Sequence, residues 1–132
     1  MDQEKPVGSY RIESMILLSS SFERESIIDF NQPIELQFSH SSQATETDEF
    51  KKFAVSLSFD IKGVQGETNV FAASTNMVGS FEKIGEPVVS EENFRKINAP
   101  AIIYPFIREH VHNLCAKAAV GVILLPTVNF KI

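Results

Sequence analysis

The 132-residue chain has little of several residue types that define whole protein classes. It has a single cysteine, Cys115, and no tryptophan, so an intramolecular disulfide and a cysteine-based zinc cluster are both excluded. Basic residues are also scarce: 12 Lys and Arg against 17 Asp and Glu give a formal net charge of −5. This balance argues against the basic surface with which a protein binds nucleic acid. The 43% of hydrophobic residues is enough for one globular core.

Long apolar runs are missing as well. No run reaches the roughly 18 residues that a membrane-spanning helix needs, so we expect no membrane insertion. The polar start, Met1-Asp2-Gln3-Glu4-Lys5-Pro6, lacks the apolar segment of a signal peptide. We therefore expect a cytoplasmic protein, with residues 1–9 as a flexible tail and residues 10–132 as a single domain.

Several segments alternate apolar and polar residues, as strands with one buried face do. The clearest alternation runs from Lys52 to Ile61. Similar patterns predict strands over residues 10–18, 34–39 and 68–78. In the first of these, Tyr10, Ile12, Ile16 and Leu18 are expected on one face.

The connections follow from the breaks in these patterns. Ser19-Ser20-Ser21 is expected to end the first strand, and residues 22–33 read as a nonperiodic connection that packs or binds through its apolar side chains. Residues 40–49 are expected to form a polar loop. Gly63 and Gly66 are expected to supply a hairpin turn.

Residues 99–118 have the strongest helical pattern. Asn98 is the expected N-cap, and Pro105 favours a regular helix that begins near that residue. A short helix is also expected after Ser90, with Glu91 and Glu92 in its first turn. Apolar residues recur at steps of three and one and draw a stripe along the long helix: Ile103, Phe106, Ile107, His110, Val111, Leu114, Cys115 and Ala118.

The order of elements predicts an α+β fold: a four-stranded antiparallel sheet with one long C-terminal helix packed on it. One helix covers only part of such a sheet, so much apolar surface is left for a partner. We therefore expect a homo-oligomer. The residues expected to pack the helix or the oligomer are Ile103, Phe106, Ile107, Val111 and Leu114.

Catalytic constellations are scarce in this sequence. His110 and His112 project about 200° apart on a helix, so they cannot bind one metal ion together. Cys115 falls on the apolar stripe, where cysteine acts as a small hydrophobe. The sequence has no glycine-rich phosphate loop and no nucleophile elbow. We therefore predict no enzyme, no metal and no cofactor, and an enzyme that uses His110 or Cys115 is the weakest alternative.

Two C-terminal motifs carry a likeness to a known family. The run Asn98-Ala99-Pro100-Ala101-Ile102-Ile103-Tyr104-Pro105-Phe106-Ile107-Arg108-Glu109 resembles the start of the long helix of the SecB protein-export chaperones. Leu124-Leu125-Pro126-Thr127-Val128-Asn129-Phe130 resembles the Leu-x-Pro-x-Val-Asn-Phe ending of the same family. Weaker collinear likenesses lie upstream at Ser21-Phe22-Glu23, at Asp29-Phe30 with Pro33, and at Gly66-Glu67 with Phe71.

The resemblance implies an ATP-independent holdase chaperone that binds unfolded or precursor polypeptides in apolar grooves and works without a cofactor. It also implies a homotetramer arranged as a dimer of dimers. Carried over to this sequence, Phe30 is expected to line the groove, with Ile27 and Ile28 as neighbours. Glu23 would contact the SecA motor of protein export.

The sequence departs from the family in two ways. Positions that are acidic in the family read Ser19 and Ser74, and a leucine position reads Ala72, so we expect weaker steering toward SecA. The sequence stops at Lys131-Ile132, where the family continues into a further helix and a tail, so we expect both to be missing. Two alternatives stay open: a SecB-like chaperone of a specific partner, such as an antitoxin, and a non-catalytic interaction scaffold.

Overall fold

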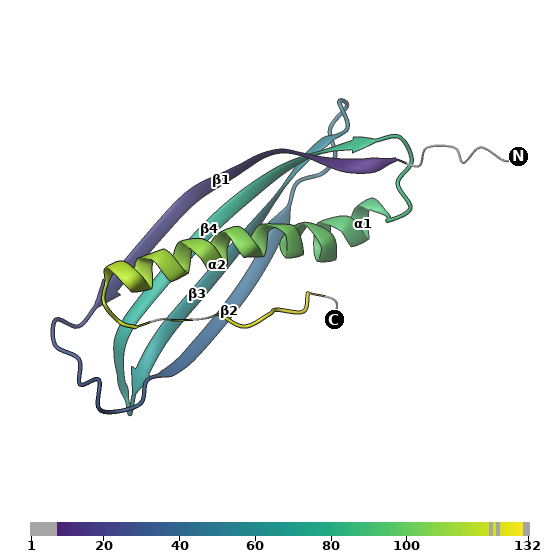
Figure 1. Ribbon diagram of the computed structural model, residues 1–132. Coiled ribbons are helices and arrows are strands. Elements are labelled where there is room, and N and C mark those ends of the chain that lie inside the picture. The colour runs from purple at the N-terminus through teal and green to yellow at the C-terminus, as the bar shows by residue number, and fades with distance from the viewer. Residues whose placement is uncertain (1–7, 122, 124, 131–132) are drawn as a thin grey trace, which may run out of the picture.

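The computed structural model of the chain describes residues 8–121, 123 and 125–130, and it is an α+β fold (Figure 1). Its four strands join into one antiparallel sheet, as predicted, and their order in the sheet is β1-β4-β3-β2. The elements are β1 (Ser9–Arg24), β2 (Glu35–Ala44), β3 (Lys52–Gln65), β4 (Thr68–Ile84), α1 (Glu91–Asn93), the π-helical turn η1 (Phe94–Asn98) and α2 (Ala99–Lys117).

The two faces of the sheet differ in composition. The long helix α2 lies obliquely across one of them, here called the helix-side face (Figure 1). Alternate residues of the central strands are buried there, together with Ile103, Ile107, Val111 and Cys115 of α2. The opposite, open face carries small and polar residues such as Ser56, Ser58 and Ser74. The buried strand residues on this face include Phe53, Val55, Leu57, Phe59, Ile61, Phe71, Ala73, Thr75, Met77 and Phe81.

Strand β1 is longer than the sequence pattern predicts. It continues through Ser19-Ser20-Ser21 to Arg24, because β4 pairs with it over this whole stretch. The pairing register shifts between Ile12 and Ser14 and again between Leu17 and Ser19. Each shift inserts an extra residue and moves the following side chains to the other face. The predicted grouping on one face is therefore wrong.

The other strands are also longer than predicted. β2 continues to Ala44 through residues expected to form a loop, because an edge strand exposed on both faces needs no apolar alternation. The hairpin turn uses Gly66, whose φ of 60° suits glycine, whereas Gly63 lies within β3. A Cβ at Gly63 would lie 2.2 Å from the Phe71 ring.

The helical region is continuous rather than divided at residue 98. Ser90 caps α1 as predicted, since its hydroxyl accepts a hydrogen bond from the Asn93 amide. Asn98 is not an N-cap, because its backbone is helical and the π turn joins α1 to α2. Pro105 lies inside α2, where the packing of Ile103 and Ile107 outweighs the loss of one backbone hydrogen bond.

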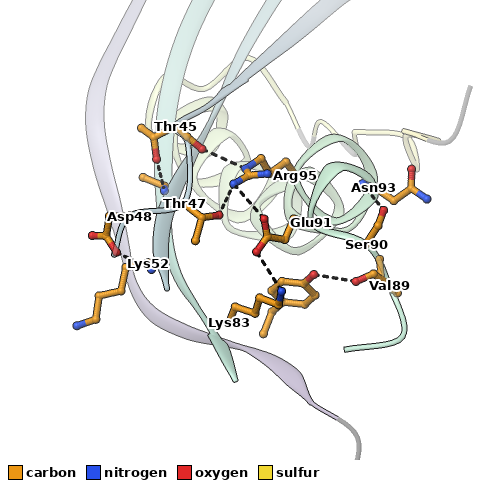
Figure 2. Close-up of polar contacts among 12 residues, drawn as sticks. Thr45, Thr47, Asp48, Lys52, Lys83, Val89, Ser90, Glu91, Asn93 and Arg95 are labelled. Atoms are coloured by element: carbon orange, nitrogen blue, oxygen red, sulfur yellow. Dashed lines mark hydrogen bonds and ion pairs between the residues drawn. The ribbon is translucent and has the colours of Figure 1, made fainter. Parts of the chain in front are cut away.

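Arg95 ties the start of the helical region to the β2–β3 loop (Figure 2). Its guanidinium donates hydrogen bonds to the Thr45 carbonyl and the Thr47 hydroxyl, and it lies 4.9 Å from the centre of the Phe53 ring. Glu91 bridges Arg95 and Lys83 with ion pairs of 3.8 and 3.3 Å. These contacts hold the start of the helical region against the β2–β3 loop and the end of β4.

The predicted tail and chain end fall partly outside the description. Residues 1–7, 122, 124 and 131–132 lie outside the described residues, and Ser9 begins β1. Among the residues described, no helix has the length and apolarity needed to cross a membrane.

Candidate functional site

Exposed apolar side chains mark the surfaces that this fold leaves for partners. Large hydrophobic residues in water are informative when they gather. They gather along the edge strand β1 and in residues 25–34, here called the crossover segment, which joins β1 to β2. The β1 residues are Ile12, Ile16, Leu17 and Leu18.

The crossover segment presents two apolar side chains and buries a third. Ile27 is 91% exposed and Phe30 is 55% exposed, whereas Ile28 is only 8% exposed and packs in the core. Ile28 therefore fastens the segment to the domain. The sequence analysis expected Ile28 beside Phe30 in the groove, but its side chain is buried in the core. Phe30 and Ile27 remain available to a ligand.

Two polar side chains hold the crossover segment at its ends. Gln65, at the end of β3, donates from its amide nitrogen to the carbonyls of Asp29 and Gln32 at 2.8 and 3.2 Å. Arg24 donates to the carbonyl of Ala118 at the end of α2 and to that of Glu25 at 2.8 Å. The segment is thus a shelf held by hydrogen bonds. Neither set of hydrogen bonds is visible in the sequence, because the acceptors are backbone carbonyls.

A further exposed aromatic residue lies on the neighbouring strand. Phe38 of β2 is 44% exposed on the helix-side face and stacks on Phe59, with ring centres 5.8 Å apart. The centre of the Phe59 ring in turn lies 5.5 Å from the centre of the Tyr104 ring of α2. Phe38 therefore extends the buried core to the outer edge of the sheet.

Described C-terminal residues lie between α2 and β2. The Tyr104 hydroxyl donates a 2.6 Å hydrogen bond to the Pro126 carbonyl, and the Phe130 ring lies 5.1 Å from that of His40. Burial raises the pKa of Tyr104. A groove of about 560 Å³ separates α2 from this segment, and its wall is apolar at Pro105, Ile123 and Leu125. Arg108, Glu109 and His112 form its polar rim.

The helix residues predicted to pack divide into two groups. Ile103, Ile107 and Val111 are buried against the sheet, and Leu114 is half-buried. Phe106 is 45% exposed and does not pack in the core of the described residues. Tyr104 is a buried contact that the sequence analysis missed, although it lies three residues before Ile107 on the same stripe.

Glu23 lies on the opposite face of the sheet from Phe38. It is exposed near the end of β1, opposite Ala72 on the open face. Ser19 and Ser74 lie on the same face, opposite Asn76 and Ser21. The open face therefore presents hydroxyl groups at two positions where the SecB resemblance would place carboxylates.

The candidate catalytic groups have structural roles. His110 contacts the Ser20 hydroxyl through Nε2 at 2.8 Å, which ties α2 to β1. Cys115 is fully buried, and burial raises the pKa of its thiol, so it is a poor nucleophile. Within the described residues, no three His, Cys, Asp or Glu side chains gather in a group that could hold a metal ion.

Comparisons with known proteins agree with this architecture. A family model described as the preprotein translocase subunit SecB matches residues 5–132. The solved structure of the SecB-like chaperone Rv1957 of Mycobacterium tuberculosis, in complex with a ChAD peptide from the Rv1956 HigA1 antitoxin, superposes with a TM-score of 0.78. Its sequence identity is 18%, and the match covers 91% of each chain, so it bears on the fold.

Two further relatives carry no established function. An uncharacterized protein of Methanocaldococcus jannaschii, MJ0357, is 32% identical over 74 residues, which span 52% of this chain and 48% of that protein. A Streptococcus agalactiae structure of unknown function superposes with a TM-score of 0.51 at 11% identity, covering 92% of this chain and 100% of that one.

Proposed function

Because the chain belongs to the SecB family, we propose that it is a chaperone that binds unfolded polypeptides on the apolar surface around the crossover segment. The observation that carries the proposal is the pair of exposed residues Ile27 and Phe30 on a shelf fastened by Ile28 and Gln65. A shelf already fixed in place loses little conformational entropy when a ligand binds.

The mechanism is transfer of apolar surface out of water. Unfolded chains expose side chains that a folded protein buries, and covering them against Phe30 stabilises the complex by about 25 cal/mol per Å². Burial of apolar surface is non-directional and carries no demand for one sequence. Several such contacts along one client add avidity. No nucleotide is required, so the proposal is an ATP-independent holdase of the cytoplasm.

We also propose that the working form is a homo-oligomer, with a tetramer as the expected state. Ile12, Ile16, Leu17 and Leu18 leave exposed apolar side chains on both faces of the edge strand β1. A second copy placed along this edge would pair the open strand and bury part of this apolar surface.

A specific partner is the second candidate. The superposed mycobacterial chaperone was solved with an antitoxin peptide, which favours a dedicated polypeptide client over a general export role. The serines at positions 19 and 74 agree with this choice, because they remove charge from the face on which Glu23 lies. Titration with SecA at low salt separates the two, since an export chaperone binds SecA and a dedicated chaperone does not.

Phe30→Asp tests the binding surface. A charge at this position opposes burial by an apolar client, and we expect client affinity to fall about tenfold, the equivalent of roughly 1.4 kcal/mol. The measurement is suppression of light scattering by a chemically denatured client, without ATP. Phe50→Asp is the matched control, because Phe50 is an exposed phenylalanine in the β2–β3 loop. Equal suppression by wild type and Phe30→Asp would contradict the assignment.

A further inference from the structure

The groove between α2 and the C-terminal segment combines apolar walls with charged groups of both signs. Its volume of about 560 Å³ falls within the range of about 300–1,000 Å³ that is usual for small-ligand sites. The α2 residues that line it recur at steps of three and one, so they lie on one face of the helix. The lining residues are Pro105, Arg108, Glu109 and His112 of α2, and Ile123 and Leu125 of the segment.

The apolar part of the groove suits an aliphatic side chain. Leu125 is only 6% exposed and belongs to the core, so it forms a fixed wall. Ile123 is half-buried against the same core. Pro105 is exposed on α2, where its ring holds one conformation of the backbone. A branched apolar side chain placed here would be covered by three apolar residues.

Arg108 supplies a positive group with spare hydrogen-bond donors. Its guanidinium carbon lies 5.8 Å from the centre of the Tyr104 ring, which holds the group beside the helix. Arg108 forms no ion pair with any carboxylate of the described residues. A guanidinium has five N–H donors and can hold a carboxylate through two parallel hydrogen bonds. Arg108 therefore favours a ligand that has a carboxylate.

Glu109 and His112 supply hydrogen-bond acceptors on the same rim. One oxygen of the Glu109 carboxylate, Oε1, accepts from the Asn113 amide nitrogen at 3.0 Å, which leaves Oε2 for a ligand. His112 Nδ1 lies 3.5 Å from the Ile123 carbonyl, so the proton of the neutral ring is assigned to Nδ1 and Nε2 is an acceptor. A carboxylate and an unprotonated imidazole nitrogen together favour an ammonium group.

From this arrangement we infer that the groove binds a free α-amino acid with a branched apolar side chain, such as leucine. The carboxylate of the ligand lies at Arg108, its ammonium group at Glu109 and His112, and its side chain against Leu125. A fatty acid fits less well, because Glu109 would repel its carboxylate while no group of the ligand met the acceptors. An internal segment of a polypeptide has neither charged end. The inference therefore goes beyond the proposed function and does not depend on it.

Four related compounds test the inference on the full-length protein. They are leucine, glycine, leucinamide and N-acetylleucine. Glycine lacks the side chain, leucinamide lacks the carboxylate and N-acetylleucine lacks the ammonium group. Titrations followed in ¹H–¹⁵N correlation spectra measure each affinity. We expect a Kd on the order of 1 mM for leucine, in keeping with so few contacting atoms, and binding at least about fivefold weaker for each of the other three.

Variants of the two charged residues show which end of the ligand each one holds. Arg108→Gln should weaken leucine at least about fivefold and leave leucinamide unchanged, because leucinamide has no carboxylate to lose its partner. Glu109→Gln should weaken leucine and leave N-acetylleucine unchanged for the corresponding reason. Lys117→Gln is the matched control, since Lys117 is an exposed cation in the last turn of α2 and does not line the groove. Circular dichroism verifies that all three variants are folded.

The same titrations distinguish the rival occupants. Equal binding of N-acetylleucine and leucine would assign the groove to the carboxyl end of a polypeptide, and equal binding of leucinamide would assign it to an amino end. Either result overturns the inference, as does equal binding of glycine and leucine. A groove covered by a second copy would respond to none of the four compounds, and that result overturns it as well.

Discussion

One side chain, that of Tyr104, links the sheet, α2 and the C-terminal segment. Tyr104 packs against Phe59 and donates its hydroxyl proton to the Pro126 carbonyl. Its phenol is buried, which raises its pKa above the ordinary value near 10. The ionised form is therefore less stable in the folded protein than in the unfolded chain.

The raised pKa of Tyr104 predicts a loss of stability at high pH. Above pH 10 the unfolded chain releases the proton while the folded chain retains it, so the free energy of unfolding falls as pH rises. Tyr104→Phe removes this proton. We expect the variant to be about 1 kcal/mol less stable than wild type at pH 7, because the hydrogen bond is lost.

Urea unfolding at several pH values checks this prediction. The gap between wild type and Tyr104→Phe should narrow above pH 10. Tyr10, whose pKa is also raised by burial, titrates in both proteins and cancels in the comparison. A gap that stays constant from pH 7 to pH 11 would contradict the assignment.

At the scale of residues, the sequence predicted which helix positions are apolar better than it predicted whether each side chain is buried or exposed. The stripe identified Ile103, Ile107 and Val111 as buried because their spacing follows the helix period. It also included Phe106, which is exposed, since a stripe wider than one contact face includes residues at its margin. Ile28 was expected beside Phe30 in the groove but is buried in the core, because a nonperiodic segment gives no sign of which side chain turns inward.

At the scale of elements, the crossover segment depends on clamps from its neighbours. Arg24 links it to the end of α2, and Gln65 links it to the end of β3. A ligand that binds to Phe30 therefore meets a surface whose position is set by two other elements.

Gln65→Met should weaken client binding while leaving the fold intact. Methionine has a similar volume but cannot donate to the Asp29 and Gln32 carbonyls, so the segment becomes mobile and ordering it on binding costs free energy. We expect a threefold to tenfold loss of client affinity and a melting temperature within a few degrees of wild type. Suppression of light scattering by the chemically denatured client measures it, with Glu67→Met in the adjacent turn as the control. Unchanged affinity in Gln65→Met would mean that the clamp is dispensable.

The sequence predicted the existence of all four strands and their order along the chain, but not their lengths. Alternation is visible where one face is buried, as in β3, and absent where both faces are exposed, as in the second half of β2. The two register shifts of β1 are set by pairing with β4, which no local pattern reports. The π turn before α2 also removed the boundary expected at Asn98.

For the whole molecule, the proposed assembly depends on the β1 edge. Leu18 is 65% exposed at the second register shift, with Ile16 and Leu17 beside it. Burial of a leucine side chain contributes about 1.5–3 kcal/mol. In a two-fold contact each partner supplies this row.

Leu18→Asp should dissociate the proposed oligomer. Sedimentation velocity of the wild type at micromolar concentration should give a multiple of 14.7 kDa, and the variant should shift toward smaller species with at least a tenfold weaker association constant. Phe50→Asp is again the control and should leave the mass unchanged. A wild-type mass of one chain would remove the oligomer from the proposal altogether.

The sequence signalled an excess of apolar surface but could not assign it. Composition and a single helix predicted that part of the sheet would need a partner. Whether a given side chain faces the core, a client or another copy depends on strand order, which places β1 and β2 at opposite edges.

That strand order also limits how many chains can join through β1, and so how many client-binding surfaces one assembly has. Two chains joined through β1 would form one continuous ribbon with a β2 strand at each flank. Growth by further β1 pairing then stops, and each pair carries two crossover segments, one from each chain. A long client would have to wrap around the particle to occupy both, which would hold its intervening residues apart and slow their collapse.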